Sequence, residues 1–356
     1  MNKNVNPKIS VLMPVYNCMR FIEESINSIL NQTFRDYEFI IIDDCSSDGT
    51  FEYIQSLYDP RIRIIRKTQR TGITVSLNMG LDVAKGEYIA RMDGDDISVP
   101  NRFERQVAFM DENPEVVACG GGYEAIGIPD IKYVPNSSND DIILDLFSFS
   151  CIAHPTVFLR SIILKNNNIR YDLNYEPAED YKMWTILSEY GKLANIKDVL
   201  LYYRLHPNQI SNQRAASQKE LKKLISFEYI KCLSNNNENI DLFCNSKLQT
   251  IKDFRKYESV ENDIRYTLKA RGINTNEKFF FERKRHHIEW SLNRIEYSLP
   301  QAIEDFKLLF RSRSLLGNKF IIKYLVKNII YSIRVDRLCK NVYRLLLGLV
   351  GKTPLS

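Results

Sequence analysis

Two pairs of aspartates, each at the end of a strand-like segment, are the residues best placed to do chemistry. Asp93 and Asp95 occur in Arg91-Met-Asp-Gly-Asp-Asp96, directly after an apolar segment. Residues two positions apart in an extended segment point to the same side, so these two carboxylates would face one space. Carboxylate oxygens are ligands for Mg²⁺ or Mn²⁺, and such a cation also binds the oxygens of a diphosphate. The motif therefore predicts a site for a divalent cation and a diphosphate.

The same motif has a structural interpretation. Acidic clusters at strand ends also occur as solvated turns or helix caps, and a bare Asp-Gly-Asp triplet does not separate these roles. Asp96 precedes Ser98 and Pro100, which resemble the start of a helix. An aspartate side chain at such a place can cap free backbone N–H groups. A capping role for Asp96 therefore stays open.

The second pair, Asp43 and Asp44, follows the apolar segment 37–42. A carboxylate at this place could accept the ring N–H of a pyrimidine base through a charge-assisted hydrogen bond. The alternative is an N-cap of the following helix. Three nearby residues compete for that capping role, namely Ser46, Ser47 and Asp48.

The segments that must position these residues alternate between strand and helix. Apolar segments predict strands over 8–15, 37–43, 62–65 and 87–92, and apolar residues at helical spacing predict helices over 21–30 and 75–84, with another opening after 46–49. This repetition predicts an α/β fold with a doubly wound, mostly parallel sheet. Ligands of such sheets bind at the carboxyl ends of the strands. We therefore expect the loops at 14–17, 43–49 and 93–96 to converge.

The pattern changes after residue 115. Glycine-rich and hairpin-like segments are expected over 116–122, 156–160 and 199–206, with an amphipathic helix over 178–190. Beyond residue 215 the chain alternates between helical segments and polar, Asn-rich connections. We therefore expect one domain over 1–215 and a mainly helical C-terminal region over 216–356.

The composition excludes several classes of protein. With 356 residues, 44% of them apolar, and only 14 glycines and 12 prolines, the chain resembles globular proteins rather than disordered or collagen-like ones. It contains no run of about 18 uncharged apolar residues, and its first residues do not resemble a signal sequence. The seven scattered cysteines include no C-x-x-C motif, which favours neither a disulfide framework nor a zinc site. These features predict a cytoplasmic protein.

Two common nucleotide-binding motifs are absent. G-x-G-x-x-G does not follow the first predicted strand, and G-x-x-x-x-G-K-[ST] does not occur. Dinucleotide-dependent redox chemistry and P-loop chemistry therefore lack their usual diphosphate cradle. A bound nucleoside diphosphate would need a metal ion to neutralise its charge, in agreement with the aspartate-rich motif.

Taken in order, six segments resemble one known family. They are Pro14-Val-Tyr-Asn17, Ser28-Ile-Leu-Asn-Gln-Thr-Phe34, Ile42-Asp-Asp-Cys-Ser-Ser-Asp-Gly-Thr50, Asn78-Met-Gly80, Lys85-Gly-Glu-Tyr-Ile-Ala-Arg-Met-Asp-Gly-Asp-Asp96 and Glu179-Asp180. Over residues 8–210 the chain closely resembles the inverting family 2 glycosyltransferases with the GT-A fold, of the bacterial surface-polysaccharide type. The resemblance implies a nucleotide-sugar half over 1–115 and an acceptor half over 116–215.

The resemblance implies roles for residues on the nucleotide side. Asp44 matches the carboxylate that pairs with uracil, and Asp93 and Asp95 match the metal-binding D-x-D motif, with Asp93 shared between metal and ribose. His206 resembles a histidine that completes the metal or diphosphate site in some members, although it could equally be a surface histidine. The expected nucleotide-sugar-binding residues are Pro14, Val15, Tyr16, Asn17, Asp44, Arg70, Asp93 and Gly94, and the expected metal ligands are Asp93, Asp95 and His206.

On the acceptor side, Asp180 matches the general base of the family. Glu179 and His154 are expected near the donor sugar or the acceptor, and Trp184 either contacts a sugar there or packs in the core. Glu179 and Asp180 also have a structural interpretation, because acidic residues in the first turn of a helix favour its dipole without any catalysis.

The resemblance implies transfer of a sugar from a UDP-sugar to a hydroxyl of a saccharide acceptor, which is expected to be lipid-linked. The expected cofactor is Mn²⁺ or Mg²⁺, which would stabilise the leaving diphosphate while Asp180 takes the proton of the attacking hydroxyl. A single displacement inverts the anomeric centre. Two alternatives stay open: a sugar nucleotidyltransferase, whose glycine-rich triphosphate loop is not found here, and a non-catalytic sugar-binding relative.

Positive charge is concentrated at the C-terminus. Residues 301–356 contain eleven Lys or Arg residues and three acidic ones. At about 100° per residue, the basic residues between Lys319 and Arg344 fall within roughly 140° of a helix. This predicts either an interfacial helix on anionic lipid or a helix packed on the catalytic domain. We expect a protein at the inner face of the cell membrane, without a nucleic-acid partner.

Overall fold

The computed structural model describes residues 6–128, 131–207, 209–235, 237–245, 251–275, 277–280 and 282–283. The chain divides into two units, residues 1–229 and residues 230–356. The boundary expected from the sequence, between residues 215 and 216, stays a prediction. The basic segment 319–344 lies outside the described residues, so neither of its two interpretations is tested.

Four parallel strands form one half of the sheet in the first unit. They are β1 (Ile9–Val15), β2 (Tyr37–Asp43), β3 (Ile62–Arg66) and β4 (Tyr88–Arg91), in the order β3-β2-β1-β4. Every residue of β1 is buried, which agrees with a sequence that is apolar except for Ser10. The predicted strands are confirmed, with ends that differ by at most one residue.

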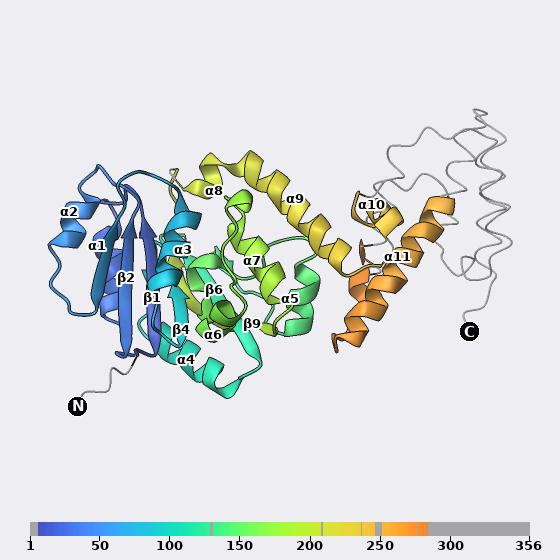
Figure 1. Ribbon diagram of the computed structural model, residues 1–356, viewed down its shortest axis with the longest axis horizontal. Coiled ribbons are helices and arrows are strands. Elements are labelled where there is room, and N and C mark those ends of the chain that lie inside the picture. The colour runs from blue at the N-terminus through green and yellow to red at the C-terminus, as the bar shows by residue number, and fades with distance from the viewer. Residues whose placement is uncertain are drawn as a thin grey trace. The chain divides into compact units, whose positions relative to one another are not determined.

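Helices cover both faces of these strands. Figure 1 shows them as α1 (Ile22–Leu30), α2 (Thr50–Gln55), α3 (Ile73–Val83) and α4 (Arg102–Glu112). The buried faces of α1 and α4 share one core cluster with Val11 and Met13. On the opposite face, α3 approaches so closely that a Cβ atom at Gly80 would lie 3.1 Å from the Leu12 side chain. Alternate residues of β1 therefore face different helices, as in a doubly wound fold.

The sheet continues with strands from the second half of the unit. Next to β4 lie β8 (Phe158–Arg160), β6 (Val116–Ala125), β9 (Lys192–Tyr203) and β5 (Ile97–Ser98), and β7 (Lys132–Tyr133) pairs with β6. The segment predicted over 199–206 contains the end of β9, which starts at Lys192 and ends at Tyr203. The register with β6 jumps from Ile196 to Val199, so Lys197 and Asp198 form a bulge. The bulge breaks the period-two pattern that would have revealed the first part of the strand.

Short helices lie between these strands. They are α5 (Asn139–Asp145), η1 (His154–Thr156), α6 (Ser161–Asn166), η2 (Leu173–Tyr175) and α7 (Glu179–Leu187). Helix α8 (Ile210–Gln213) and the longer α9 (Ala215–Cys232) follow β9. Helix α7 lies inside the range 178–190 predicted from the sequence. It begins with the Glu179-Asp180 pair, so the fold places these acids at a helix N-terminus.

The second unit is helical where it is described. It contains η3 (Asn237–Asn239), α10 (Ile240–Asn245) and α11 (Ile251–Ala270). Phe243 of α10 stacks on Tyr257 of α11 with ring centroids 5.0 Å apart, and both side chains are buried. Among the described residues of the whole chain, no helix is both long enough and apolar enough to cross a bilayer.

Candidate functional site

The loops that follow β1, β2 and β4 meet, as the sheet topology predicts. The Asp44 amide donates to the Val15 carbonyl over 2.8 Å, and the Asn17 side-chain oxygen accepts from the Ser47 amide over 2.9 Å. A Cβ atom at Gly94 would lie 3.0 Å from both Cys18 Sγ and Val15 Cγ1. Glycine therefore lets the aspartate-rich loop approach the loop after β1 closely.

The Asp44 carboxylate lies under a loop that precedes α3. Its Oδ1 accepts from the Thr71 amide over 2.8 Å and its Oδ2 from the Gly72 amide over 2.9 Å. Lys67 Nζ forms an ion pair with Oδ1 at 2.5 Å, and both side chains are about 95% buried. A carboxylate offers about four acceptor positions, of which these contacts take three. One position is left on Oδ2. Asp44 therefore does not cap the helix that follows it, α2, because its contacts are with the loop before α3 and with Lys67.

Two residues predicted to bind the nucleotide contact each other. The Arg70 guanidinium lies over the Tyr16 ring, 4.0 Å from its centroid. Both side chains are exposed, and Tyr16 directly follows β1. An aromatic face and a planar cation at one surface are suited to stacking with a flat heterocycle.

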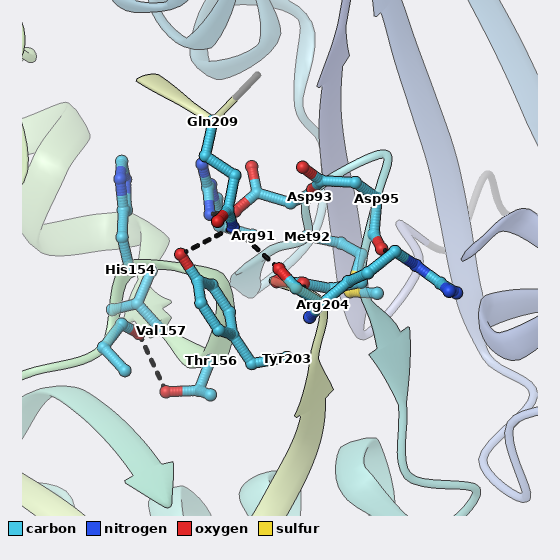
Figure 2. A network of polar contacts seen from close by, with 12 residues as sticks. Arg91, Met92, Asp93, Asp95, His154, Thr156, Val157, Tyr203, Arg204 and Gln209 are labelled. Carbon is cyan, nitrogen blue, oxygen red and sulfur yellow. Dashed lines mark hydrogen bonds and ion pairs between the residues drawn. The ribbon is translucent and has the colours of Figure 1, made fainter. Parts of the chain in front are cut away.

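Three aspartates of the loop after β4 form an acidic cluster. The ligand atoms of Asp93, Asp95 and Asp96 lie within 4.8 Å of one another. Arg91, at the end of β4, forms an ion pair with Asp93. Figure 2 shows Arg91 beside Asp93, and Asp95 on the far side of Asp93. The cluster is thus bordered on one side by a buried guanidinium.

Residues from the end of β9 complete this cluster. His206 Nε2 lies 2.8 Å from Asp95 Oδ2, although the two residues are 111 positions apart. The Arg204 amide donates to Asp96 Oδ1 over 2.9 Å, and its Nε donates to the Asp95 carbonyl over 2.8 Å. Gln209 in turn holds the Arg204 carbonyl and the Tyr203 hydroxyl, as Figure 2 shows. The segment after β9 is therefore fixed against the acidic loop.

The capping interpretation of Asp96 is wrong. Helix α4 begins at Arg102 with Asn101 before it, and the strand β5 lies between this helix and Asp96. The Asp96 side chain is fully buried, and its Oδ2 has no hydrogen-bond partner. Ser98 and Pro100 are typical of helix starts, but pairing of Ile97 and Ser98 with β9 delays the helix.

The electrostatics of the acidic cluster favour binding of a cation. Burial raises the pKa of Asp93 to about 6, with Arg91 opposing the rise and Asp95 adding to it. Burial also raises the pKa of Asp96 well above its usual value, and the charges of Asp93 and Asp95 contribute. Close like charges in a partly buried site repel one another, and a bound cation removes that repulsion.

The residues present fit a divalent cation. Aspartate oxygens and an imidazole nitrogen are ligands that Mn²⁺ accepts, and the oxygens also suit Mg²⁺. Asp96 Oδ2 is buried and has no hydrogen-bond partner, and this observation supports the presence of a cation site. The distance of 2.8 Å between His206 and Asp95 places both at one point of the cluster.

A second pair of acidic residues begins helix α7. Asp180 Oδ2 accepts from the Ser150 hydroxyl over 2.8 Å, and the Trp184 indole N–H donates to Ser150 Oγ over 3.1 Å. Glu179 is about 95% buried, and its Oε2 has no hydrogen-bond partner. Burial raises the pKa of Glu179 to about 8, and the neighbouring Asp180 charge adds to this. Burial also raises the pKa of Asp180, whereas Ser150 and the more distant cation Arg91 lower it.

His154 and Trp184 lie beside this pair. His154 Nε2 is 3.1 Å from the Tyr171 hydroxyl, and its ring packs edge-on against Trp184 with centroids 5.9 Å apart. Burial and the charge of Arg91 hold the pKa of His154 well below its usual value, so the imidazole is neutral. Trp184 is completely buried, so its ring offers no face for a sugar to stack on. Of the two interpretations of Trp184, core packing describes its environment.

Glu176, which the sequence analysis did not single out, connects the loop before α3 with the segment that leads into α7. Glu176 accepts from the Thr74 amide over 3.2 Å and from Arg214 over 3.0 Å. Gly72 has a φ of +94°, and a Cβ there would lie 2.8 Å from the Glu176 carboxylate. Only glycine therefore suits this position, and the loop held by Asp44 also touches the segment that leads into α7.

Three residues of this site, Lys67, Arg91 and Ser150, had no role assigned from the sequence, because the sequence shows only their local surroundings. Lys67 directly follows β3, and Arg91 is the last residue of the buried strand β4. Both side chains are buried, and a buried charged side chain signals a counter-charge nearby. Ser150 lies in a loop without any local pattern. It joins the site only because α7 folds back onto that loop.

Comparisons with known proteins agree with this geometry. The family model described as Glycosyl transferase family 2 matches residues 10–163. An uncharacterized glycosyltransferase of Haemophilus influenzae is 35% identical over 237 residues, which are 63% of this chain and 73% of that protein. The UDP-Glc:alpha-D-GlcNAc-diphosphoundecaprenol beta-1,3-glucosyltransferase WfaP of Escherichia coli is 32% identical, over 57% of this chain and 79% of that protein.

Solved structures share the fold. The crystal structure of S. aureus TarS 1–349 in complex with UDP-GlcNAc aligns with a TM-score of 0.51 and 21% sequence identity. The alignment covers 73% of this chain and 81% of the TarS chain. The fold of the chain is therefore GT-A, and the sequence-based prediction of that fold is confirmed.

Proposed function

This chain belongs to glycosyl transferase family 2, and from that premise we propose that it is an inverting, metal-dependent transferase. Its substrates are a UDP-sugar and a hydroxyl of a saccharide acceptor, and its product is part of a surface polysaccharide. The observation that carries the proposal is the acidic cluster, in which Asp95 meets His206 at 2.8 Å across 111 residues of sequence.

On the donor side, Asp93, Asp95 and His206 would hold the cation, and the buried Asp96 completes the acidic cluster. When bound, the cation would stabilise the negative charge that develops on the leaving diphosphate. Arg91 keeps Asp93 paired on its buried side. That contact fixes the direction of the Asp93 carboxylate before any substrate binds.

The nucleoside would bind where the loops after β1 and β2 meet. Tyr16 and Arg70 supply a flat surface for the base, and Asn17 shapes the loop through its contact with the Ser47 amide. Asp44 has one acceptor position left on Oδ2, which suits the ring N–H of uracil. Three contacts hold that carboxylate in place, so little ordering would be needed on binding.

On the acceptor side, Asp180 would accept the proton of the attacking hydroxyl. A general base must be ionised and fixed in direction, and Asp180 receives the Ser150 hydroxyl as a donor on Oδ2. Attack from the face opposite the diphosphate inverts the anomeric carbon, so an α-linked donor yields a β-linked product. Glu179, which adjoins Asp180, and His154, which packs against Trp184, would contact the donor sugar or the acceptor.

The proposed acceptor rests on the name of a relative, and the proposed location of the protein rests on that acceptor and on the basic residues of the C-terminal segment. WfaP, which is 32% identical, is named for transfer to a diphosphoundecaprenol-linked sugar with a β linkage. A lipid-linked acceptor would place this protein at the inner face of the cell membrane. The eleven basic residues of 301–356 provide the charge to attract anionic lipid there.

The test is hydrolysis of a panel of UDP-, GDP- and CMP-sugars with and without Mn²⁺, measured as released nucleotide. We expect metal-dependent release from one UDP-sugar, and about a 10³-fold lower rate for Asp95→Ala, because metal stabilisation of the leaving group is worth several kcal/mol. Asp198→Ala, which removes an exposed aspartate paired with Arg105, is the matched control. Equal release from wild type and Asp95→Ala would overturn the proposal.

If no donor is hydrolysed, the same proteins are assayed for transfer to synthetic sugars that are linked to a lipid through a diphosphate. Transfer that needs Mn²⁺ and Asp95 supports the proposal in the same way. Binding of a UDP-sugar without hydrolysis or transfer would identify a non-catalytic sugar-binding relative instead.

A further inference from the structure

The Ser150 hydroxyl lies between two groups of the acceptor side. Its Oγ is 2.8 Å from Asp180 Oδ2 and 3.1 Å from the Trp184 indole nitrogen. The same indole N–H also lies 3.2 Å from the Ile152 carbonyl. Ser150 comes from the loop before η1, whereas Asp180 and Trp184 are one helical turn apart on α7.

The directions of these hydrogen bonds follow from the chemistry of the three side chains. An indole N–H can only donate, so Ser150 Oγ accepts from Trp184. A serine hydroxyl has one proton, and an ionised carboxylate can only accept. The proton of Ser150 is therefore directed to Asp180. Rotation of the hydroxyl away from Asp180 would break its hydrogen bond with the Trp184 N–H.

We propose that Ser150 is a positioning residue for Asp180, held in its donating orientation by Trp184. This inference rests on the proposed role of Asp180 as general base. Ser150 has two effects on that base. It fixes the direction of the carboxylate, and it stabilises the ionised form that can accept a proton.

The second effect matters because the surroundings work against ionisation. Burial raises the pKa of Asp180, and the Ser150 hydroxyl is the largest contribution that lowers it. The charged and titratable groups near Asp180 are Glu179 on α7, Arg91 at the end of β4, Lys222 on α9, Tyr171 and Cys151. The backbone amide of Tyr181 also donates to this carboxylate, whereas Arg91 and Lys222 act on it only through their charge and cannot fix its direction.

Trp184 gives the arrangement its rigidity. Its ring is completely buried and packs edge-on against His154. A side chain held this way keeps its N–H in one place. Its hydrogen bond to Ser150 Oγ therefore also restricts the position of the Ser150 hydroxyl. Trp184 thus acts on the acceptor side through Ser150 and not by contact with a sugar.

The experiment measures the pH dependence of kcat/KM for wild type, Ser150→Ala, Ser150→Thr and Trp184→Phe. Loss of the hydroxyl should raise the pKa of Asp180, so the acidic limb of the Ser150→Ala profile moves to higher pH by about one unit. Below that limb kcat/KM falls about tenfold, and above it by less than about threefold. Ser150→Thr keeps a hydroxyl and should restore the wild-type limb, and Trp184→Phe should fall between.

Ser148→Ala, which removes an exposed serine two residues earlier, is the matched control. Affinity for UDP, measured by calorimetry, should be unchanged in every variant. A Ser150→Ala profile lowered by one factor at all pH values would overturn the inference, because a purely structural role predicts that result. So would a Ser150→Thr variant that behaves like Ser150→Ala.

The outcome for Asp180→Asn separates this inference from the proposed function. If Asp180→Asn keeps wild-type turnover, the general-base role itself fails. If Asp180→Asn is inactive while Ser150→Ala keeps the wild-type limb, only the inference about Ser150 fails.

Discussion

The first unit contains two acidic clusters whose partners differ. Asp93, Asp95 and Asp96 form the donor-side cluster, which is bordered by Arg91 and meets His206 at 2.8 Å. Glu179 and Asp180 form the acceptor-side cluster. There Asp180 is held by the neutral Ser150 hydroxyl, and one oxygen of Glu179 has no hydrogen-bond partner.

This difference in partners separates two kinds of chemistry. Carboxylates close enough to share a cation, next to a nitrogen ligand, are suited to hold a metal ion. Carboxylates that are desolvated without a directly paired cation have raised pKa values and are suited to exchange protons. Similar residue types thus acquire different roles from their surroundings, and substitutions in one cluster should leave the properties of the other unchanged.

In the acceptor-side cluster, the largest expected effect is that of Asp180→Asn. The amide keeps the shape of the side chain but cannot accept the proton, so turnover should fall by about 10² or more. UDP affinity and the Mn²⁺ dependence of UDP binding should stay at wild-type values, because both belong to the donor-side cluster. Steady-state kinetics and calorimetry with UDP and Mn²⁺ measure the two properties separately.

Loss of UDP affinity in Asp180→Asn would contradict the separation of the two clusters. Asp172→Asn, at a partly exposed capping position before η2, is a matched control because it makes the same change outside both clusters. Its turnover should equal that of wild type.

A smaller effect is expected for His206→Gln. Removing the imidazole leaves the aspartate oxygens, so Mn²⁺ should bind about tenfold more weakly, as for the loss of one auxiliary ligand. Turnover at saturating Mn²⁺ should recover to within a few-fold of wild type. Electron paramagnetic resonance of Mn²⁺ titrated into the protein with UDP measures this affinity. An unchanged affinity would remove His206 from the metal site.

Glu179→Gln should change stability more than activity. The pKa of Glu179 is about 8 in the folded protein against a usual value of 4.5, so the folded state holds a proton that the unfolded state loses. Wild type therefore loses stability as the pH rises from 4.5 to 8, and glutamine does not. The variant should gain about 2 kcal/mol over wild type at pH 8, less than the full shift because Asp180 titrates with Glu179.

Thermal unfolding at pH 5 and pH 8 measures this difference, which should be close to zero at the lower pH. Glu112→Gln, on the exposed end of α4, is the matched control. At pH 7 the transfer activity of Glu179→Gln should stay within about threefold of wild type. A stability gain that is the same at both pH values would show that Glu179 is ionised in the folded protein.

Much of the fold could be predicted from local sequence. The strands β1 to β4 and the helices between them follow from apolar segments, and Asp93 and Asp95 could be placed because they directly follow a strand. The sequence did not indicate that β6 pairs in parallel with β9, because the bulge at Lys197 and Asp198 interrupts the alternation. It also suggested a capping role for Asp96, whose pairing partner in fact lies 108 residues away at Arg204.

The sequence by itself determined the residue types of the site, the strand that carries the acidic loop and the family to which the chain belongs. Only the tertiary structure decided which partners those residues have. His206 reaches Asp95, Lys67 reaches Asp44 and Ser150 reaches Asp180 through contacts between elements far apart in the chain. Hydrophobic patterns record which residues are buried but not which buried residues meet, and the pKa of a carboxylate depends on the groups it meets.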